Sequence, residues 1–216
     1  MAQGFKETLG GRFIVLDGPD GCGKSTQQRL LSEALVREGL EVSCMRDPGT
    51  TTAGESIRQI LLSGDHGSLD PRCELLLFMA ARAQMIAECI RPALAAGRVV
   101  LGDRFVSASC AYQGASGLDP AQIVQIGHFA IGGRWPDLTI VLDVPAELGM
   151  ERIRKTEKAA ALDAMERRPL DFHRRVREIF LNLGRVYPAP VAVIDATVAP
   201  EVVHQRILEV LDRVDH

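Results

Sequence analysis

The stretch GPDGCGKST, residues 18–26, decides the fold of this chain. It matches the pattern G-x-x-x-x-G-K-[ST], with Gly18, Gly23, Lys24 and Ser25 in the required places. Glycines let the backbone curl so that several N–H groups hold phosphate oxygens, and the start of a helix adds partial positive charge. The lysine reaches the outer phosphates and the hydroxyl binds Mg²⁺. The pattern therefore predicts a nucleoside triphosphate site but leaves the reaction open.

Every residue of this stretch is a candidate for binding the triphosphate. The set is Gly18, Pro19, Asp20, Gly21, Cys22, Gly23, Lys24, Ser25 and Thr26.

Outward from this loop, strand-like and helix-like segments alternate. Five short apolar, β-branched runs are RFIVLD (12–17), EVSCM (41–45), RVVLGD (98–103), LTIVLD (138–143) and VAVID (191–195). Such runs are typical of parallel strands covered on both faces. Helical patterns follow at 25–37 and 72–95, after Pro120, Pro145 and Pro169, and from Pro200 to about Val214. We predict an α/β fold of the P-loop NTPase type, with a five-stranded parallel sheet between helices.

The 216 residues suit a single domain, 1–216, with a flexible lead-in at 1–11 that lacks a signal-peptide pattern. The charged stretch 154–168 is interpreted as a solvated helical excursion that serves as a lid. A net charge of -3 favours neither nucleic acid polymers nor anionic membranes as partners. Five cysteines without a CxxC pair indicate reduced, mostly buried thiols and a cytoplasmic protein.

The class of P-loop protein is indicated by a second group of residues. The chain has no NKxD-type base-reading motif, which argues against a GTPase, and its length is short for a motor. Polar residues follow the strand ends in RDPG (46–49) and DRFVSASCAYQG (103–114), and Phe78 and Arg82 share a helix face in FMAAR. Loops after parallel strands converge on the ligand crevice. We therefore expect a small kinase with an acceptor pocket.

In this order and spacing, GPDGCGKST, RDPG, FMAAR and DRFVSASCAYQG resemble the thymidylate kinases of the bacterial type. The resemblance covers about residues 12 to 213. It implies transfer of a phosphoryl group from ATP to dTMP with Mg²⁺, a five-stranded parallel core and a homodimer.

The resemblance also implies how the nucleoside part of dTMP is bound. Phe78 would stack on the thymine ring, and Arg82 would donate to a thymine carbonyl. Gln113 would hydrogen-bond in the base pocket, where Ser109 keeps a hydroxyl. Tyr112 would pack where a ribose 2′-hydroxyl would otherwise sit, which favours deoxynucleotides.

The phosphates are the other part of the implied site. Arg58 and Arg104 would clamp the acceptor phosphate, a task that suits a guanidinium fork. Asp103 would bind Mg²⁺ together with Ser25. Asp20 matches an acidic position near the sugar and phosphate of the acceptor. Lys24, Asp103 and Arg104 are the expected catalytic groups outside the lid.

Some residues depart from the family pattern. Asp47, beside Pro48, stands where glutamate is usual, so its contact is expected to loosen or to run through water. Thr50 replaces a second glycine, and Ala108 replaces a common serine. Base recognition is then expected to rely more on Arg82 and Gln113.

The lid departs most. Asp163-Ala164-Met165-Glu166 occupies the place of a DRxE-like segment, so alanine replaces the expected catalytic arginine. Cys22 supplies no arginine from the P-loop either. Because the transferred phosphoryl group needs cationic stabilisation, we expect Arg154 or Arg167 to provide it.

Two alternatives stay open on the sequence alone. One is a kinase for another deoxynucleoside monophosphate, such as dUMP. The other is a nucleotide-binding regulator with weak catalysis, which the alanine at position 164 would suit.

Overall fold

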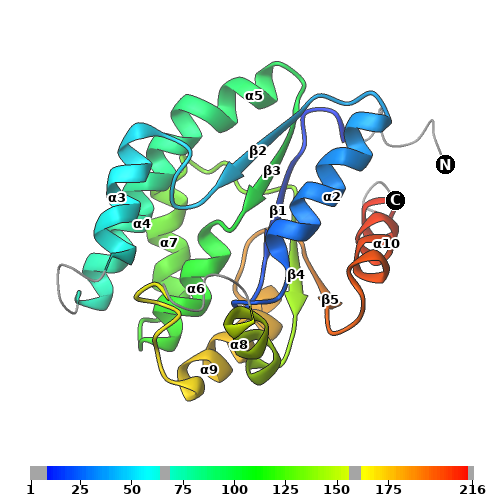
Figure 1. The fold of residues 1–216 in the computed structure, drawn as a ribbon. Helices are drawn as coiled ribbons and strands as arrows, with labels where there is room; N and C mark the ends of the chain where they lie inside the picture. Colours follow the sequence, from blue (N-terminus) through cyan, green and yellow to red (C-terminus); the bar gives the residue numbers. More distant parts are fainter. Residues whose placement is uncertain (1–8, 64–68, 156–161, 214–216) are drawn as a thin grey trace.

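The computed structural model describes residues 9–63, 69–155 and 162–213, and it confirms the expected α/β architecture (Figure 1). All five predicted strands form. They are β1 (Phe13–Asp17), β2 (Val42–Arg46), β3 (Val99–Asp103), β4 (Leu138–Asp143) and β5 (Val191–Asp195). The sheet order is β2-β3-β1-β4-β5, and every neighbouring pair is parallel. The strand that enters the glycine-rich loop is therefore the central one.

Helices fill the connections between the strands, and one more follows the last strand. They are α2 (Lys24–Arg37), α3 (Thr52–Leu62), α4 (Pro71–Met85), α5 (Arg91–Ala95), α6 (Val106–Ala115), α7 (Pro120–Ala130), α8 (Ala146–Arg154), α9 (Leu170–Leu181) and α10 (Pro200–Leu211). Two predicted starts are capped as expected, because Asp70 accepts the N–H of Arg72 and Asp119 accepts that of Ala121. The last helix ends at Leu211, before the predicted end near Val214.

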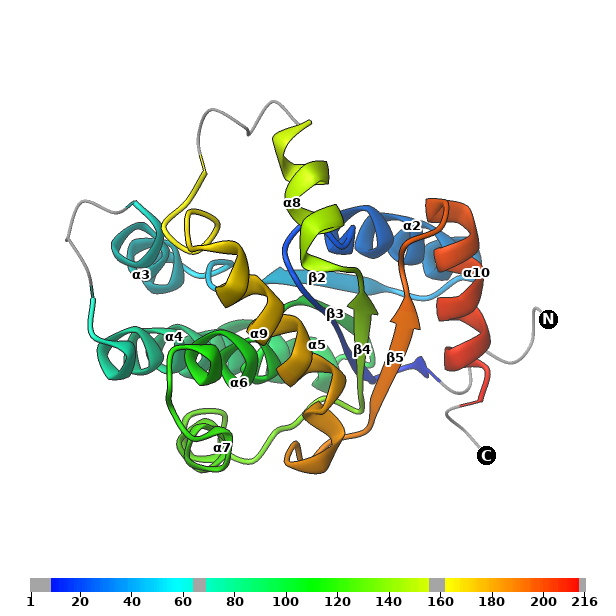
Figure 2. The same ribbon diagram turned by 90° about the horizontal axis from the view of Figure 1, so that it is seen from below.

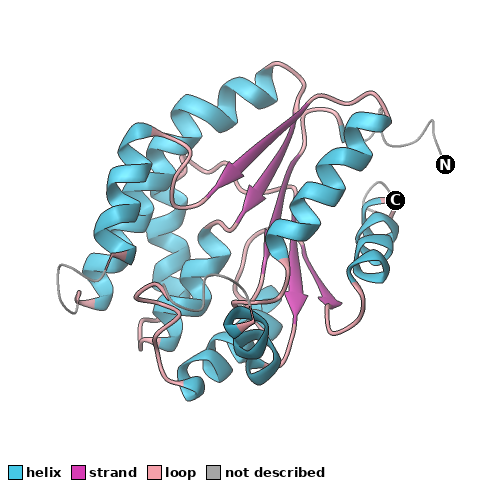
Figure 3. Ribbon diagram, in the orientation of Figure 1, coloured by secondary structure: helices cyan, strands magenta, loops and turns pink. Residues whose placement is uncertain are grey.

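The alternation of side chains along β1 explains why both faces of the sheet are covered. Phe13 and Val15 pack into the core beneath α4, α6 and α9, whereas Ile14 and Leu16 pack beneath α2 and α10. Figure 2 shows these two helical layers on opposite sides of the sheet, and Figure 3 shows the strands between them. At the outer strand β2 the expectation of full burial is wrong, because Cys44 is exposed. Cys73 on α4 is exposed too.

The helical pattern at 72–95 is interrupted rather than continuous. A π-helical turn, Ile86–Ile90, separates α4 from α5, and the N–H of Arg91 bonds to the carbonyl of Ile86, five residues back. Pro92 follows at once. Because proline has no N–H and its ring crowds the preceding turn, a regular α-helix cannot run through this point.

Two expectations about peripheral segments change. Leu9 is only 1% exposed and Gly11 N–H bonds to Gly97 O, so the described end of the lead-in is packed rather than flexible. Residues 162–168 form turns rather than a lid helix, and Pro169 disfavours the helical conformation at Arg168, directly before it. Residues 156–161 of the predicted lid lie outside the described residues. Among the described helices, none has the length and apolar character needed to cross a bilayer.

Candidate active site

The glycine-rich loop curls between β1 and α2, as its composition predicts. Gly21 has φ 73°, and a Cβ atom there would lie 2.1 Å from the carbonyl oxygen of Gly149 in α8. The loop therefore requires glycine at this crossing. The ammonium group of Lys24 donates to the carbonyls of Gly18 and Pro19 at 3.3 and 3.1 Å, which holds the charge against the loop.

A groove runs along this loop at the carboxyl ends of the strands. Its lining includes residues from the loop, from the ends of β2 and β3, from α8 and from the segment after β5. These are Asp20 to Gln27, Arg46, Asp47, Arg58, Asp103, Arg104, Arg152, Ile153, Asp163, Glu166, Ala196, Val198, Pro200 and Val203.

Oxygen ligands for a hard cation lie in this groove. Ser25 Oγ is 3.4 Å from Asp103 Oδ2. The described residues contain no cluster of three or more His, Cys, Asp or Glu side chains that could chelate a metal by themselves. One hydroxyl and one carboxylate fit Mg²⁺, which binds proteins through few ligands and takes the rest from phosphates and water.

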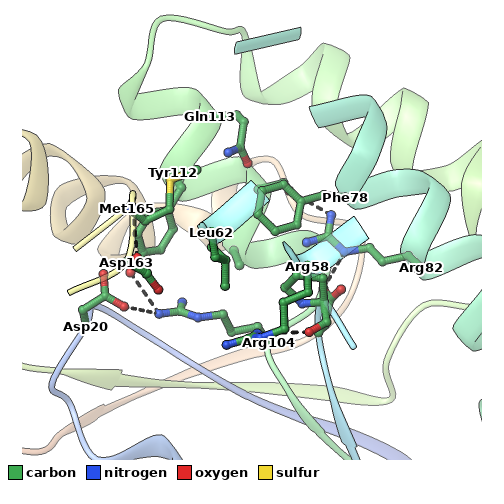
Figure 4. Close-up of a pocket in the computed structure, with 14 residues that line it drawn as sticks. Asp20, Arg58, Leu62, Phe78, Arg82, Arg104, Tyr112, Gln113, Asp163 and Met165 are labelled. Atoms are coloured by element: carbon green, nitrogen blue, oxygen red, sulfur yellow. Dashed lines mark hydrogen bonds and ion pairs between the residues drawn. The ribbon is translucent and has the colours of Figure 1, made fainter. Parts of the chain in front are cut away.

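A second cavity adjoins the groove (Figure 4). All ten residues predicted to bind the acceptor line it. They are Asp20, Asp47, Pro48, Arg58, Phe78, Arg82, Arg104, Ser109, Tyr112 and Gln113. Leu62, Ala108, Asp163 and Met165 complete the lining. The structure thus brings together side chains from α3, α4, α6 and three strand ends.

Arg104 stands in the wall between the two cavities. Its guanidinium donates to Asp17 at 3.1 Å, to Asp20 at 2.5 Å and to the Tyr112 hydroxyl at 3.0 Å. Its backbone has φ 69°, a left-handed conformation that costs a non-glycine residue about 1 kcal/mol. These contacts hold the guanidinium in one place despite that strain.

The position of Asp20 beside this cation determines the pKa of its carboxyl group. Burial alone would raise the pKa of its carboxyl group, but the charges of Arg104 and Lys24 outweigh burial and lower the pKa below its ordinary value. Asp20 is therefore an anion throughout the neutral range. It neutralises part of the positive charge of Arg104 and Lys24.

Asp47 and Arg82 form a buried ion pair in the wall of the acceptor cavity. Arg82 Nε lies 2.6 Å from Asp47 Oδ2, and each side chain is 1% exposed. Arg82 also donates to Ser109 Oγ at 2.8 Å, and its guanidinium lies 5.5 Å from the centre of the Phe78 ring. Burial raises the pKa of Asp47, an effect that Arg82 opposes. We expected the short side chain of Asp47 to make a loose or water-mediated contact. With Arg82, however, Asp47 makes a direct contact.

Thr50 adopts the backbone conformation that a glycine would hold without strain. Its φ is 68°, and its hydroxyl accepts from Arg46 N–H at 2.8 Å and donates to Arg46 O at 3.1 Å. These two hydrogen bonds close the turn after β2 and offset the strain.

The segment that carries Ala164 begins with a capping box. Asp163 Oδ1 accepts from the N–H of Glu166, and Glu166 Oε2 accepts from the N–H of Asp163. Asp163 and Met165 line the acceptor cavity, whereas Ala164 lines a different groove, beside α3 and α9. The D-x-x-E spacing was the signal that could have predicted this turn.

The predicted lid arginines do not line either cavity in this structure. Arg154 lies at the end of α8, and Arg167 donates to the carbonyl of Leu162 at 2.7 Å. Arg152, an arginine near the lid that we did not favour from the sequence, lines the groove and donates to the carbonyls of Ala196 and Thr197 at 3.0 and 3.2 Å. No sequence signal separates Arg152 from its neighbours.

The P-loop lines a groove, and this groove adjoins a cavity in which arginines lie around an aromatic ring. These two features define a class of protein, the P-loop kinases that bring an acceptor phosphate to a nucleoside triphosphate. The family model described as thymidylate kinase matches residues 16–207. The chain belongs to the thymidylate kinase family.

Individual relatives agree with this membership. The thymidylate kinase of Kosmotoga olearia is 43% identical over 198 residues, which are 91% of this chain and 93% of the relative. That of Thermomicrobium roseum is 45% identical over 192 residues, 88% of this chain and 90% of the relative. A crystal structure of thymidylate kinase from Ehrlichia chaffeensis has a TM-score of 0.74 and 31% identity, and the match covers 94% of this chain and 98% of that one.

Replacing Asp47 with alanine should destabilise the protein strongly, because it leaves Arg82 buried without a counter-charge. We expect Asp47→Ala to lower the free energy of unfolding by about 3–5 kcal/mol. The matched control is Glu55→Ala, which removes a pair with Arg46 whose side chains are 54% and 45% exposed. That control should cost less than about 1 kcal/mol. Urea unfolding of both variants measures the difference, and equal small losses would contradict a stabilising role for the buried pair.

Proposed function

We propose that this chain transfers the γ-phosphoryl group of ATP to the phosphate of dTMP, giving dTDP and ADP. The observation that carries the proposal is the common wall of the two cavities. Asp20, Asp47, Arg58, Arg104 and Asp163 line both of them. A triphosphate in the groove and a monophosphate in the cavity would therefore meet at Arg58 and Arg104.

On the donor side, the P-loop amides and Lys24 bind the phosphates of ATP and neutralise their charge. Ser25 and Asp103 would hold Mg²⁺, which supplies further charge neutralisation when bound. The segment after β5, with Ala196 and Val198, would contact the adenine.

On the acceptor side, the base and the phosphate are bound at opposite ends of the cavity. Phe78 would stack on the thymine, and Arg82 would donate to a thymine carbonyl. Tyr112 would pack against the deoxyribose. The guanidinium groups of Arg58 and Arg104 would hold the acceptor phosphate in line with the donor.

No strong general base is needed for the transfer. The acceptor phosphate is already an anion near pH 7, so its oxygen can attack the γ-phosphorus directly. Catalysis is then positioning combined with stabilisation of the charge on the transferred group.

The acceptor preference can be tested with a panel of monophosphates. We expect kcat/KM for dTMP to exceed that for dCMP and dGMP by about a hundredfold or more, because buried polar groups would stay unpaired with the wrong base. Lys24→Ala should lower kcat about a hundredfold or more. A coupled ADP-release assay measures both.

The same assay separates the alternatives. Equal rates with dTMP, dCMP and dGMP would remove the thymine preference. Tight binding of ATP and dTMP with turnover near zero would identify a regulator instead of a kinase.

The source of the lid charge is a separate prediction. We expect Arg154→Ala or Arg167→Ala to lower kcat by about a thousandfold while KM for dTMP stays within a factor of about three. Arg152→Ala is the comparison, because its contacts with Ala196 and Thr197 predict a higher KM for ATP. Unchanged kcat in both Arg154→Ala and Arg167→Ala would exclude a lid arginine at these positions.

We also propose a cytoplasmic homodimer. All five cysteines are free thiols, as expected in a reducing compartment. Leu76 on α4 and Phe129 on the neighbouring α7 are 58% and 88% exposed, and Ala80 and Ala83 extend the exposed apolar side of α4. A second copy of the chain would cover such a surface.

A charge at this surface should disrupt the dimer. We expect the wild type to sediment at twice the chain mass of 23.5 kDa, and Phe129→Glu to sediment as a monomer. Val202→Glu on α10 is the matched control, because Val202 is also partly exposed but lies on the opposite helical layer. Analytical ultracentrifugation measures the mass, and a monomeric wild type would contradict the proposal.

A further inference from the structure

Glu74 is a buried carboxylate that links the acceptor cavity to the segment after Glu166. It lies in the first turn of α4 and is 4% exposed. Glu74 Oε2 accepts from Gln113 Nε2 at 3.2 Å, and Glu74 Oε1 accepts from Arg168 Nη2 at 2.6 Å. None of the roles proposed above uses Glu74.

The partners of Glu74 determine which way the amide of Gln113 points. A carboxylate paired with an arginine can only accept hydrogen bonds, so the amide nitrogen of Gln113 must face Glu74. The amide oxygen is then directed elsewhere. It is buried, it has no partner among the described residues, and Gln113 lines the acceptor cavity. In Figure 4 this oxygen is turned toward the Phe78 ring.

The base end of the cavity therefore presents a particular pattern of hydrogen-bonding groups. Arg82 supplies a donor and Gln113 supplies an acceptor. A pyrimidine with a ring N–H beside a carbonyl group, such as thymine, complements both. Bound in the same orientation, cytosine would place its amino donor where thymine has its 4-carbonyl group, against Arg82, and its ring-nitrogen acceptor against the oxygen of Gln113, so both contacts would be mismatched.

Resting on the proposed function, we propose that Glu74 is a positioning residue that sets the preference for thymine over cytosine by fixing the orientation of the Gln113 amide. Glu74 does not contact the base itself. It acts through Gln113, whose oxygen it directs into the cavity.

Arg168 fixes Glu74 in turn. Arg168 Nη1 donates to Ser116 Oγ at 2.7 Å, and its guanidinium lies 4.6 Å from the centre of the Phe172 ring. A guanidinium has donors only, so the side chain at position 74 must present an oxygen to it.

The substitution Glu74→Gln tests this arrangement with nearly the same shape. Its carbonyl oxygen would face Arg168, and its NH₂ group would therefore face Gln113. The Gln113 amide must then turn over and direct its own NH₂ into the cavity. We expect the ratio of kcat/KM for dTMP to that for dCMP to fall at least about tenfold, mainly through KM for dTMP, with KM for ATP unchanged.

Two further variants separate positioning from a general structural role. In a Gln113→Met background the amide is absent, so adding Glu74→Gln should change the dTMP to dCMP ratio less than about twofold. Asp137→Asn is the matched control, since Asp137 likewise accepts from an arginine, Arg134, and from an amide N–H, here the backbone N–H of Phe13, but far from the cavity. It should leave the ratio unchanged.

The outcomes are distinct. An unchanged ratio in Glu74→Gln, or an equal fall in the Gln113→Met background, would overturn the role of Glu74 while the wild type still phosphorylates dTMP. A wild type that does not phosphorylate dTMP would instead overturn the proposed function.

Discussion

The site depends on the contacts that hold the guanidinium group of Arg104 between Asp17 and Asp20. β1 and β3 are neighbours in the sheet, so the carboxylate at the end of one strand lies beside the arginine that follows the other. Asp17 is fully buried and also accepts from Ser107 Oγ at 2.6 Å, which leaves it no freedom to move. Because the arginine is fixed from the protein side, its remaining surface can face two phosphates at once.

The same arrangement recurs around the acceptor cavity, where buried charges are paired by the protein before any ligand is bound. Asp47 holds Arg82, and Glu74 holds Arg168. Burying each charge alone would be unfavourable, and pairing offsets the desolvation. The gain is electrostatic preorganisation, since dipoles and charges that are already oriented need not reorganise during the reaction.

Much of this could be predicted from the sequence, because the signals were local. The runs ending at Asp17, Asp103 and Asp143 are short, apolar and β-branched, and Asp70 and Asp119 each precede a proline at a helix start. Convergence of strand ends also predicted that the residues after β2 and β3 would share one crevice with the P-loop, whereas the places of Phe78 and Arg82, which lie on a helix, followed from the family resemblance.

The remainder depends on contacts that no local pattern encodes. Leu9 is buried because it packs with apolar side chains of the sheet that are distant in the sequence. The pairing of Glu74 with Gln113 and Arg168 joins residues 39 and 94 positions apart.

The crossing of Gly21 and Gly149 is of this kind too: a Cβ atom on Gly149 would lie 2.3 Å from the carbonyl of Asp20, and one on Gly21 would meet the carbonyl of Gly149. Each clash is with main chain, which no side-chain replacement elsewhere can remove. A substitution at one of these glycines therefore cannot be compensated by a substitution at the other. The codons for both glycines should be among the slowest in the gene to diverge.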